Sequence, residues 1–500
     1  MSDDAHDLLV IGGGINGAGI ARDAAGRGLS VLLAERGDLA GHTSSSSTKL
    51  IHGGLRYLEY YEFRLVREAL AERERLLRLA PHVIWPLRFV LPHDEGLRPA
   101  WMLRLGLFLY DHLARLRTLP GSETVDLRAS TLGAPLQARL TRGFVYSDCW
   151  VEDSRLVVLN AMDARERGAV ILTRTGVVAA RRDDGAWTAT LRDEATGLER
   201  TVRARAVVNA AGPWVSATLS GTLGLARRSA VRLIKGSHIV VPRLFDGEQA
   251  YILQQPDKRI VFAIPYECDF TLIGTTDVPY AGEPGPVAIS PEETEYLCGC
   301  VDRAFTRRIA PADVVWSYSG VRPLYDDAAE NASAVTRDYV LDLDDGGAPV
   351  LSVFGGKITT YRRLAEHALE RLAPHFPGMG PAWTGEGILP GGDMPGADFD
   401  RFLADLKSQK KFLPEETARR LARAYGTRVH DLLGAATSMA DLGEAFDGGL
   451  TGAEVDYLRA HEWAVSGEDI LWRRSKLGLR TGAASAARLT AYLERRAAAA

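Results

Sequence analysis

Cysteine is scarce in this chain, because its 500 residues include only Cys149, Cys268, Cys298 and Cys300. A disulfide framework is not expected at this density, and the spacings match neither a Cys-x-x-Cys pair nor a Cys-His metal site. We therefore predict free thiols, no bound metal and a reducing compartment that faces the cytoplasm.

Long apolar runs and an excess of one charge are also missing. No apolar run reaches the roughly eighteen residues of a transmembrane helix. The formal net charge of -4 gives no sign of nucleic-acid binding. The remaining composition, 46% hydrophobic and 25% charged, is ordinary for a soluble globular protein. The length allows about two or three domains.

Residues 7–36 contain a complete β-α-β pattern for nucleotide binding. The apolar run 8–11 predicts a buried parallel strand, which leads into Gly12-x-Gly14-x-x-Gly17 and a helix. The second strand, 30–34, ends on Glu35, where a ribose hydroxyl needs an acceptor. We predict a diphosphate at the positive N-terminus of this helix. This segment alone does not distinguish FAD from NAD.

Three later segments are predicted to complete the cofactor region. The polar loop 41–57 could wrap a diphosphate and bring Arg56 near a redox ring, although such a loop can also be a plain linker. The buried strand before Ala211 and Gly212 ends in small residues that allow close approach to a cofactor. Residues 350–360 form a second strand-glycine-helix junction, which is either an ordinary helix start or aims its positive end at a flavin ring. A dinucleotide region assembled from distant segments favours FAD.

The strands expected between residues 231 and 344 alternate more and carry more aromatic residues. This pattern predicts an antiparallel sheet that covers the flavin and binds substrate. His238 and Arg322 follow glycines at strand ends, so both are candidates for chemistry. The alternatives are a structural histidine and a surface ion pair.

Two regions outside these sheets are predicted to be helical. A charged helix is expected at 60–80, and residues 98–117 carry Trp101 and Phe108 at helical spacing, edged by arginines. The second helix could lie in a bilayer interface, or it could be a core or dimer helix. After a linker at 381–398, rich in glycine and proline, only helices are expected, at 399–407, 414–425, 453–463 and 468–477.

Several motifs together resemble one family. They are GGGINGAGIARDAAGRG, SSSSTKLIHGGLRYLE, YSDCW, LIKGSHIVVP, IGTTD, SGVRPL and LSVFGGKITTYR. In this order they resemble the FAD-dependent respiratory (aerobic-type) glycerol-3-phosphate dehydrogenases, from about residue 7 to the end of the chain. The resemblance implies oxidation of sn-glycerol 3-phosphate to dihydroxyacetone phosphate by hydride transfer to FAD, with electrons passed to ubiquinone or another membrane quinone.

The resemblance also implies a location and partners. It favours the membrane for the helix 98–117, and it implies a peripheral (monotopic) enzyme on the cytoplasmic side of the inner membrane. A homodimer is expected, and nucleic acid is not. The alternatives are a glycerol-3-phosphate or amino-acid oxidase that uses oxygen, and a flavin-holding scaffold without turnover.

Chemistry and resemblance together give each site residue a predicted role. Arg56 and Arg322 are predicted to clamp phosphate and alkoxide, with Tyr57 beside them, and Lys357 to lie near the flavin pyrimidine edge as a substrate-binding and catalytic residue. His238 is the predicted base, although a lysine with a depressed pKa could serve instead. The predicted cofactor-binding residues are Gly12, Gly14, Ile15, Asn16, Gly17, Glu35, Ser45, Ser46, Ser47, Val177, Ala211, Gly212, Gly355, Gly356, Lys357 and Thr359.

The predicted fold is α/β, with a Rossmann-like FAD-binding part, an antiparallel-sheet substrate part like that of D-amino acid oxidase, and an α-helical C-terminal domain. The first two form a composite unit over 1–384. Its FAD part comes mainly from 1–80, 145–215 and 350–375, and its substrate part mainly from 81–144 and 216–349. The helical domain is expected over 385–500.

Overall fold

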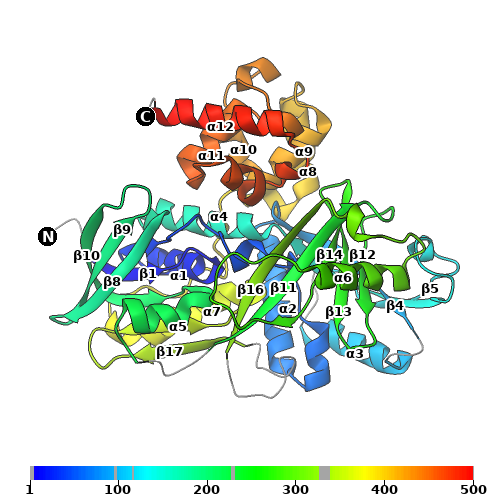
Figure 1. Cartoon of the computed structure of the whole chain (residues 1–500), viewed down its shortest axis with the longest axis horizontal. Helices are drawn as coiled ribbons and strands as arrows, with labels where there is room; N and C mark the ends of the chain where they lie inside the picture. The colour runs from blue at the N-terminus through cyan, green and yellow to red at the C-terminus, as the bar shows by residue number, and fades with distance from the viewer. Residues whose placement is uncertain (1–4, 95–97, 115–117, 227–230, 326–337, 499–500) are drawn as a thin grey trace.

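The computed structural model describes residues 5–94, 98–114, 118–226, 231–325 and 338–498, and all of their side chains except that of Arg56. Two β-sheets lie side by side, and a group of C-terminal helices lies above them in the view of Figure 1. All four cysteines are free. None of the helices in the described ranges is both long and apolar enough to cross a bilayer.

The first sheet has the strand order β17-β18-β10-β1-β2-β7. Its central pairs β1–β2, β1–β10 and β10–β18 are parallel. Leu8, Leu9 and Val10 are fully buried, which explains the unbroken apolar run of this strand. The strands are β1 (Ala5–Ile11), β2 (Val31–Ala34), β7 (Val170–Leu172), β10 (Glu199–Asn209), β17 (Val340–Asp344) and β18 (Val350–Phe354), with β8 (Thr175–Asp183) and β9 (Ala186–Asp193) attached to β10.

Three helices pack together against this sheet. They are α1 (Ile15–Gly26), α4 (Asp153–Glu166) and α7 (Tyr361–Leu372). A side chain at Gly19 would place its Cβ 2.8 Å from the Tyr361 ring, so this glycine lets α1 and α7 approach closely. The chain segments that meet here are more than three hundred residues apart, as the sequence predicted for an FAD-type region.

The second sheet has the order β15-β11-β14-β13-β12-β4-β6-β3, with β16 paired to β11 and β5 to β6. All of its pairs are antiparallel except β12 with β4. Strand β6 belongs to this sheet, although most of it falls within a segment predicted mainly for the FAD part. The strands are β3 (Leu50–Ile51), β4 (Ile84–His93), β5 (Glu123–Asp126), β6 (Arg142–Val151), β11 (Val231–Pro242), β12 (Ala250–Gln254), β13 (Ile260–Tyr266), β14 (Phe270–Gly274), β15 (Val278–Pro279) and β16 (Trp316–Tyr325).

Helices cover both faces of the second sheet. The core around α6 (Pro291–Ala304) includes Leu297 and Val301, and a separate core joins α2 (Phe63–Leu79) and α3 (Ala100–Leu113) to the strands. The helix expected at 60–80 is confirmed as α2, and the helix expected at 98–117 is confirmed as α3. Arg115 and Arg117, counted on the basic edge of the second helix, lie outside the described residues.

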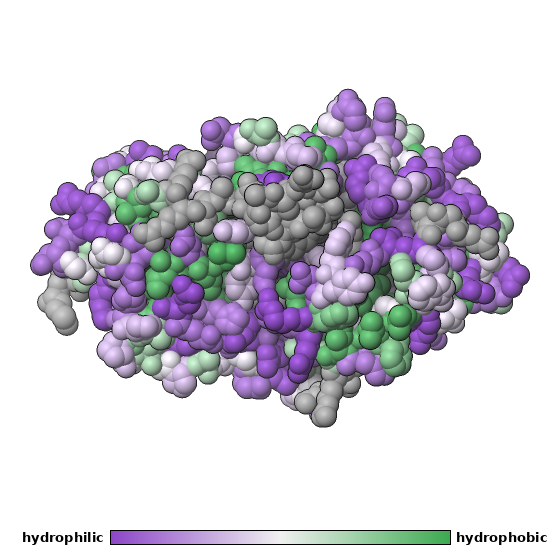
Figure 2. Space-filling model, turned by 90° about the horizontal axis from the view of Figure 1, so that it is seen from below, coloured by the Kyte–Doolittle hydropathy of each residue, from purple (hydrophilic) through white to green (hydrophobic). Residues whose placement is uncertain are grey.

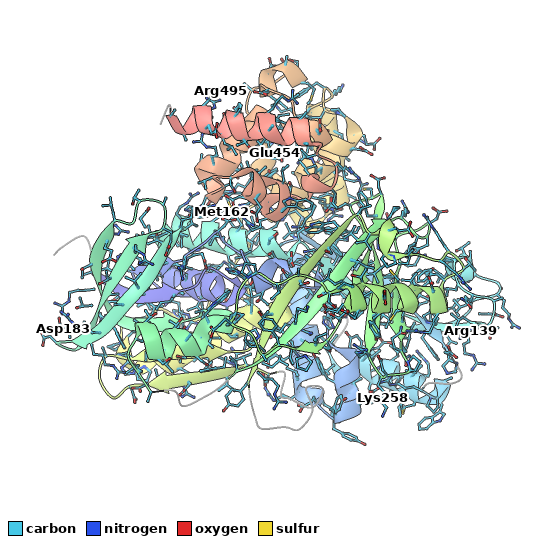
Figure 3. All side chains as sticks on the ribbon, in the orientation of Figure 1. Arg139, Met162, Asp183, Lys258, Glu454 and Arg495 are labelled. Atoms are coloured by element: carbon cyan, nitrogen blue, oxygen red, sulfur yellow. The ribbon has the colours of Figure 1, made fainter. Side chains whose placement is uncertain are left out.

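The C-terminal helices have a core of their own. They comprise α8 (Phe399–Gln409), α9 (Glu415–Tyr425), α10 (Val429–Leu433), α11 (Gly452–Glu462), the π-helical turn η13 (Asp469–Arg474) and α12 (Ala483–Ala498). Glu454, marked in Figure 3, is buried among them and accepts hydrogen bonds from Arg420 and Tyr425. The segment expected as a helix at 468–477 is only the short turn η13 followed by a 3-10 turn, and α12 was not predicted.

Candidate active site

The glycine motif forms a tight cradle between β1 and α1. Gly12 has a φ of +107°, and a Cβ there would lie 2.6 Å from the carbonyl oxygen of Ala210. A Cβ at Gly17 would lie 1.9 Å from the carbonyl oxygen of Gly12. Helix α1 begins after Gly14, which offers no side-chain cap, so the helix N-terminus keeps donors for an anion.

Glu35 lies beside this cradle at the end of β2. Its carboxylate accepts hydrogen bonds from the backbone amides of Gly13 at 2.6 Å and Gly37 at 2.7 Å. Burial raises the pKa of this carboxyl, and the two amides oppose that effect. The structure thus fixes the carboxylate at the position expected for a ribose contact, and that contact stays a prediction.

A cavity of about 590 Å³ opens between the cradle and the start of the polar loop. Six of the predicted cofactor-binding residues line it, namely Gly12, Gly14, Glu35, Val177, Ala211 and Gly212. His42, Thr43, Ser44 and Trp214 also line it and were not predicted. Ser44 Oγ accepts a hydrogen bond from the Ile15 amide at 3.0 Å, and the rings of His42 and Trp214 lie 4.6 Å apart.

The predicted serines lie just beyond this cavity lining. The Ser45 hydroxyl donates to the carbonyl of His42 at 3.0 Å, and the Ser47 hydroxyl donates to Asp153 at 2.7 Å. A Cβ at Gly320 would lie 2.7 Å from that of Ser46, so the loop packs closely on β16. The hydroxyl run signalled the correct loop, whereas spacing alone could not show that Ser44 faces the cavity.

The second glycine junction lies against the first turn of α1. Asn16 Nδ2 donates to the carbonyl of Gly355 at 3.1 Å, and Thr359 Oγ1 accepts from the His52 amide at 3.2 Å. A Cβ at Gly356 would lie 2.8 Å from Asn16 Nδ2. Asn16 Oδ1 is buried and has no partner within the described part of the chain. This orphan acceptor and the glycine cradle fit a dinucleotide with a polar ring system.

Tyr57 and Lys357 meet beside this junction. Lys357 Nζ lies 3.9 Å from the centre of the Tyr57 ring, and both side chains are half-buried. Arg56 belongs to the 3-10 helix η2 (Leu55–Tyr60), and its side chain lies outside the described residues. Because Lys357 is only half-buried, its ammonium group can bind an anionic group without being fully desolvated.

Arg322 projects from β16, which pairs with β11 so that Arg322 lies opposite Ile234. Its guanidinium forms an ion pair with Asp277 and donates to the Thr276 carbonyl at 3.3 Å. The Nε–H of Arg322 is buried without a partner among the described residues. The predicted cation is therefore present, and Asp277 is a partner that the IGTTD motif contained but that received no role.

His238 is buried on β11, with its ring stacked 4.7 Å from that of Tyr318. Its Nε2 lies 3.0 Å from the Thr48 hydroxyl, and its Nδ1 is buried without a partner in the described ranges. Burial, together with the charges of Lys49 and Arg322, lowers the pKa of His238 to about 3. The imidazole is therefore neutral near pH 7, which is the form that can accept a proton.

An ion pair that was not predicted lies close to His238 and to Tyr318, the ring stacked on it. Lys49 and Asp153 are both fully buried, with Nζ 2.7 Å from Oδ1, and Lys49 Nζ lies 5.2 Å from the centre of the Tyr318 ring. Lys49 follows the hydroxyl run directly, and Asp153 begins α4, so no sequence pattern linked them.

The polar loop connects all of these groups. Its residues contact β16 through Thr43, β11 through Thr48, the second junction through His52, and Lys357 through Tyr57. The first of these contacts is a hydrogen bond of 2.6 Å from the Thr43 hydroxyl to the Val321 carbonyl. The loop thus contacts His238 and Lys357 directly, and it meets β16 at the residue before Arg322.

Comparisons with known proteins match almost the whole chain. The model of the FAD dependent oxidoreductase family matches residues 7–362, and that of the C-terminal domain of alpha-glycerophosphate oxidase matches 384–497. A glycerol-3-phosphate dehydrogenase from Pseudomonas aeruginosa is 56% identical over 493 residues, covering 98% of this chain and 95% of the relative. A D-erythritol 1-phosphate dehydrogenase from Brucella abortus is 55% identical over 471 residues, covering 94% of each chain.

Two further relatives are also named glycerol-3-phosphate dehydrogenases. The aerobic glycerol-3-phosphate dehydrogenase of Escherichia coli is 53% identical over 492 residues, covering 98% of this chain and 97% of the relative. The X-ray structure of a glycerol-3-phosphate dehydrogenase from Bacillus halodurans complexed with FAD matches with a TM-score of 0.76 at 27% identity, covering 99% of this chain and 95% of that one. The comparisons confirm the predicted fold class and FAD as the cofactor.

Proposed function

The chain belongs to the FAD-dependent oxidoreductase family, among the FAD-dependent glycerol-3-phosphate dehydrogenases, and we propose that it oxidises sn-glycerol 3-phosphate to dihydroxyacetone phosphate. The observation that supports this proposal is that His238 and Lys357 both contact the polar loop, through Thr48 and Tyr57, while Arg322 lies close enough to His238 for its charge to lower the pKa of that ring. The chemistry that FAD supplies when bound is acceptance of a hydride from the carbon that bears the hydroxyl.

The cations supply the binding of the phosphate. A phosphate dianion is costly to bury without charged donors. Arg322 contacts Asp277 and the Thr276 carbonyl through Nη2, and its side chain is 33% exposed, so its guanidinium can bind an anion while it keeps these contacts. Lys357 provides a second cation from a different chain segment, and Arg56 stays a predicted third.

His238 is proposed to accept the hydroxyl proton. If Nε2–H donates to Thr48, the unpartnered Nδ1 carries the lone pair that takes the proton. A pKa of about 3 makes the imidazole a weak base before the substrate binds. A bound phosphate dianion adds negative charge nearby, which raises the pKa towards the range of an effective base.

A second substrate is a candidate because the Brucella abortus relative, at 55% identity, is named a D-erythritol 1-phosphate dehydrogenase. This compound also carries a phosphate and secondary hydroxyls, and it is one carbon longer. The groups described above would serve either substrate, so the assay must compare the two.

We propose a membrane quinone such as ubiquinone as the electron acceptor, and contact with the cytoplasmic face of the inner membrane through α3. This helix buries Leu103 and Leu107 but leaves Trp101 69% and Phe108 48% exposed. Seen from below, the molecule shows a hydrophobic area on the side where α3 lies (Figure 2). Exposed aromatic residues on an amphipathic helix suit a bilayer interface. The homodimer stays a prediction.

The test is a coupled assay with purified holoenzyme and a soluble ubiquinone analogue. We expect sn-glycerol 3-phosphate to give equal amounts of dihydroxyacetone phosphate and reduced quinone, at a higher kcat/KM than D-erythritol 1-phosphate. A higher value for the four-carbon substrate would replace the first proposal with the second. Equally fast turnover with oxygen, yielding peroxide, would show an oxidase, and no product with either substrate would refute both proposals.

A further inference from the structure

The C-terminal helices are joined to the loop that borders the cofactor cavity. Asp38, buried in the turn after β2, accepts hydrogen bonds from Arg473 Nε at 2.7 Å and from Arg474 Nη1 and Nη2 at 2.8 Å each. Both arginines belong to η13, more than four hundred residues later in the chain. Arg474 therefore binds this carboxylate through two parallel hydrogen bonds, and this bidentate arrangement is stronger than a single hydrogen bond.

The turn held in this way is part of the cavity wall. Glu35, Arg36, Ala40 and Gly41, on either side of Asp38, line the cavity. The Asp38 carbonyl accepts the Gly41 amide at 3.0 Å, and the Ala40 amide donates to Gly13 in the glycine cradle at 3.1 Å. A shift of Asp38 would thus be transmitted to both the turn and the cradle.

A second contact holds the same turn from another side. Asp469, at the start of η13, accepts a hydrogen bond from Arg174 Nη2 at 2.6 Å. The backbone amide of Arg174 donates to the carbonyl of Gly37 at 2.8 Å. Both ends of η13 therefore connect to residues 37 and 38.

The burial of these groups makes the connection energetically important. The side chain of Arg474 is fully buried and that of Asp38 is 3% exposed. A surface ion pair contributes little, but removing one partner of a buried pair leaves a charge without compensation. The turn next to the cradle is accordingly stabilised by a helix turn outside the two sheets.

We propose that η13 is a positioning element for FAD, and that Arg473 and Arg474 hold the turn 37–41 against the bound cofactor through Asp38. The C-terminal helices would then act in cofactor retention as well as in packing. This inference depends on FAD as the cofactor and is independent of which substrate is oxidised.

The test compares Asp38→Asn with the control Glu454→Gln in the full-length chain. Glu454 is also a buried carboxylate in an ion pair, but its side chain accepts hydrogen bonds from Arg420 and Tyr425 within the C-terminal helices, away from η13. For each apoprotein we would measure the thermal midpoint and the Kd for FAD. We expect both variants to lower the midpoint, Asp38→Asn to raise the Kd about tenfold or more, and the control to stay within about twofold.

Equal changes in Kd for the two variants would overturn the proposal, because they would show a general loss of stability. If Asp38→Asn does not fold, Arg473→Gln serves in its place, since it removes one of the three hydrogen bonds to Asp38. Faster release of FAD from that holoenzyme, measured by flavin fluorescence after dilution, supports the proposal. An unchanged release rate contradicts it.

Discussion

The hydroxyl of Thr48 lies 3.0 Å from Nε2 of His238, where the polar loop meets β11. The Thr48 hydroxyl can donate to this nitrogen or accept from it, and the other ring nitrogen is buried without a partner among the described residues. When the ring donates to Thr48, Nδ1 is the proton acceptor. The loop that borders the cofactor cavity therefore also orients the proposed base.

Replacing His238 with Asn should lower kcat by about 10²- to 10⁴-fold, the usual range for loss of a general base. The measurement is steady-state turnover with saturating sn-glycerol 3-phosphate. Thr48→Val should cause a smaller loss, because it removes the orienting contact and leaves the imidazole. A kcat of His238→Asn close to that of the wild type would exclude this residue as the base.

Replacing Arg322 with Ala should raise the KM for the phosphorylated substrate by about 10- to 100-fold, since a hydrogen bond to a charged group contributes about 1.5 to 3 kcal/mol. Arg128→Ala is a matched control, because Arg128 also pairs with a nearby aspartate but is 70% exposed at the surface. Near-normal kinetics for Arg322→Ala would remove this arginine from the substrate site.

The exposed face of α3 should carry membrane binding. Replacing Trp101 and Phe108 together with Ser should abolish sedimentation with anionic liposomes, because both rings would lose burial in the interface. Leu198→Ser is the control, since Leu198 is 73% exposed in a different part of the chain. If the double variant sediments as the wild type does, α3 is not the contact.

Acid should destabilise the fold partly through His82. Burial, with the charges of Arg155 and Arg423 nearby, lowers the pKa of His82 from 6.5 to about 3. As the pH falls, the unfolded chain protonates this histidine at a higher pH than the folded chain does. The contribution of His82 to the stability of the fold is therefore complete above pH 6.5 and is lost as the pH falls towards 3.

Between pH 7 and pH 5 this effect amounts to about 2 kcal/mol. The free energy of unfolding should be measured in urea at pH 7 and at pH 5. Its decrease between the two should be about 2 kcal/mol smaller in His82→Leu than in the wild type. The same fall in both proteins would show that His82 does not contribute.

Local patterns allowed much of the site to be predicted. The glycine cradle and Glu35 lie within thirty residues, so spacing alone placed them correctly around α1. The link from Asp38 to Arg474 had no sequence signal, because each is an ordinary charged residue until the fold joins them. Helix α12 was missed because its alanine-rich start offers no clear apolar periodicity.

The wall of the cofactor cavity also contains a detail that the sequence did not predict, namely which serine of the polar loop faces the cavity. The hydroxyl run marked the loop, yet the 3-10 turn η1 (Thr43–Ser45) brings Ser44 to the cavity and turns the Ser45 hydroxyl back to His42. Such a shift of one residue depends on backbone geometry that composition does not encode.

The proposed reaction is tested most directly by mixing the oxidised holoenzyme with sn-glycerol 3-phosphate in the absence of oxygen. We predict that the yellow flavin absorbance bleaches on the time scale of turnover, that glycerol without phosphate leaves it unchanged, and that added ubiquinone restores it. A flavin that stays oxidised with sn-glycerol 3-phosphate would contradict the account.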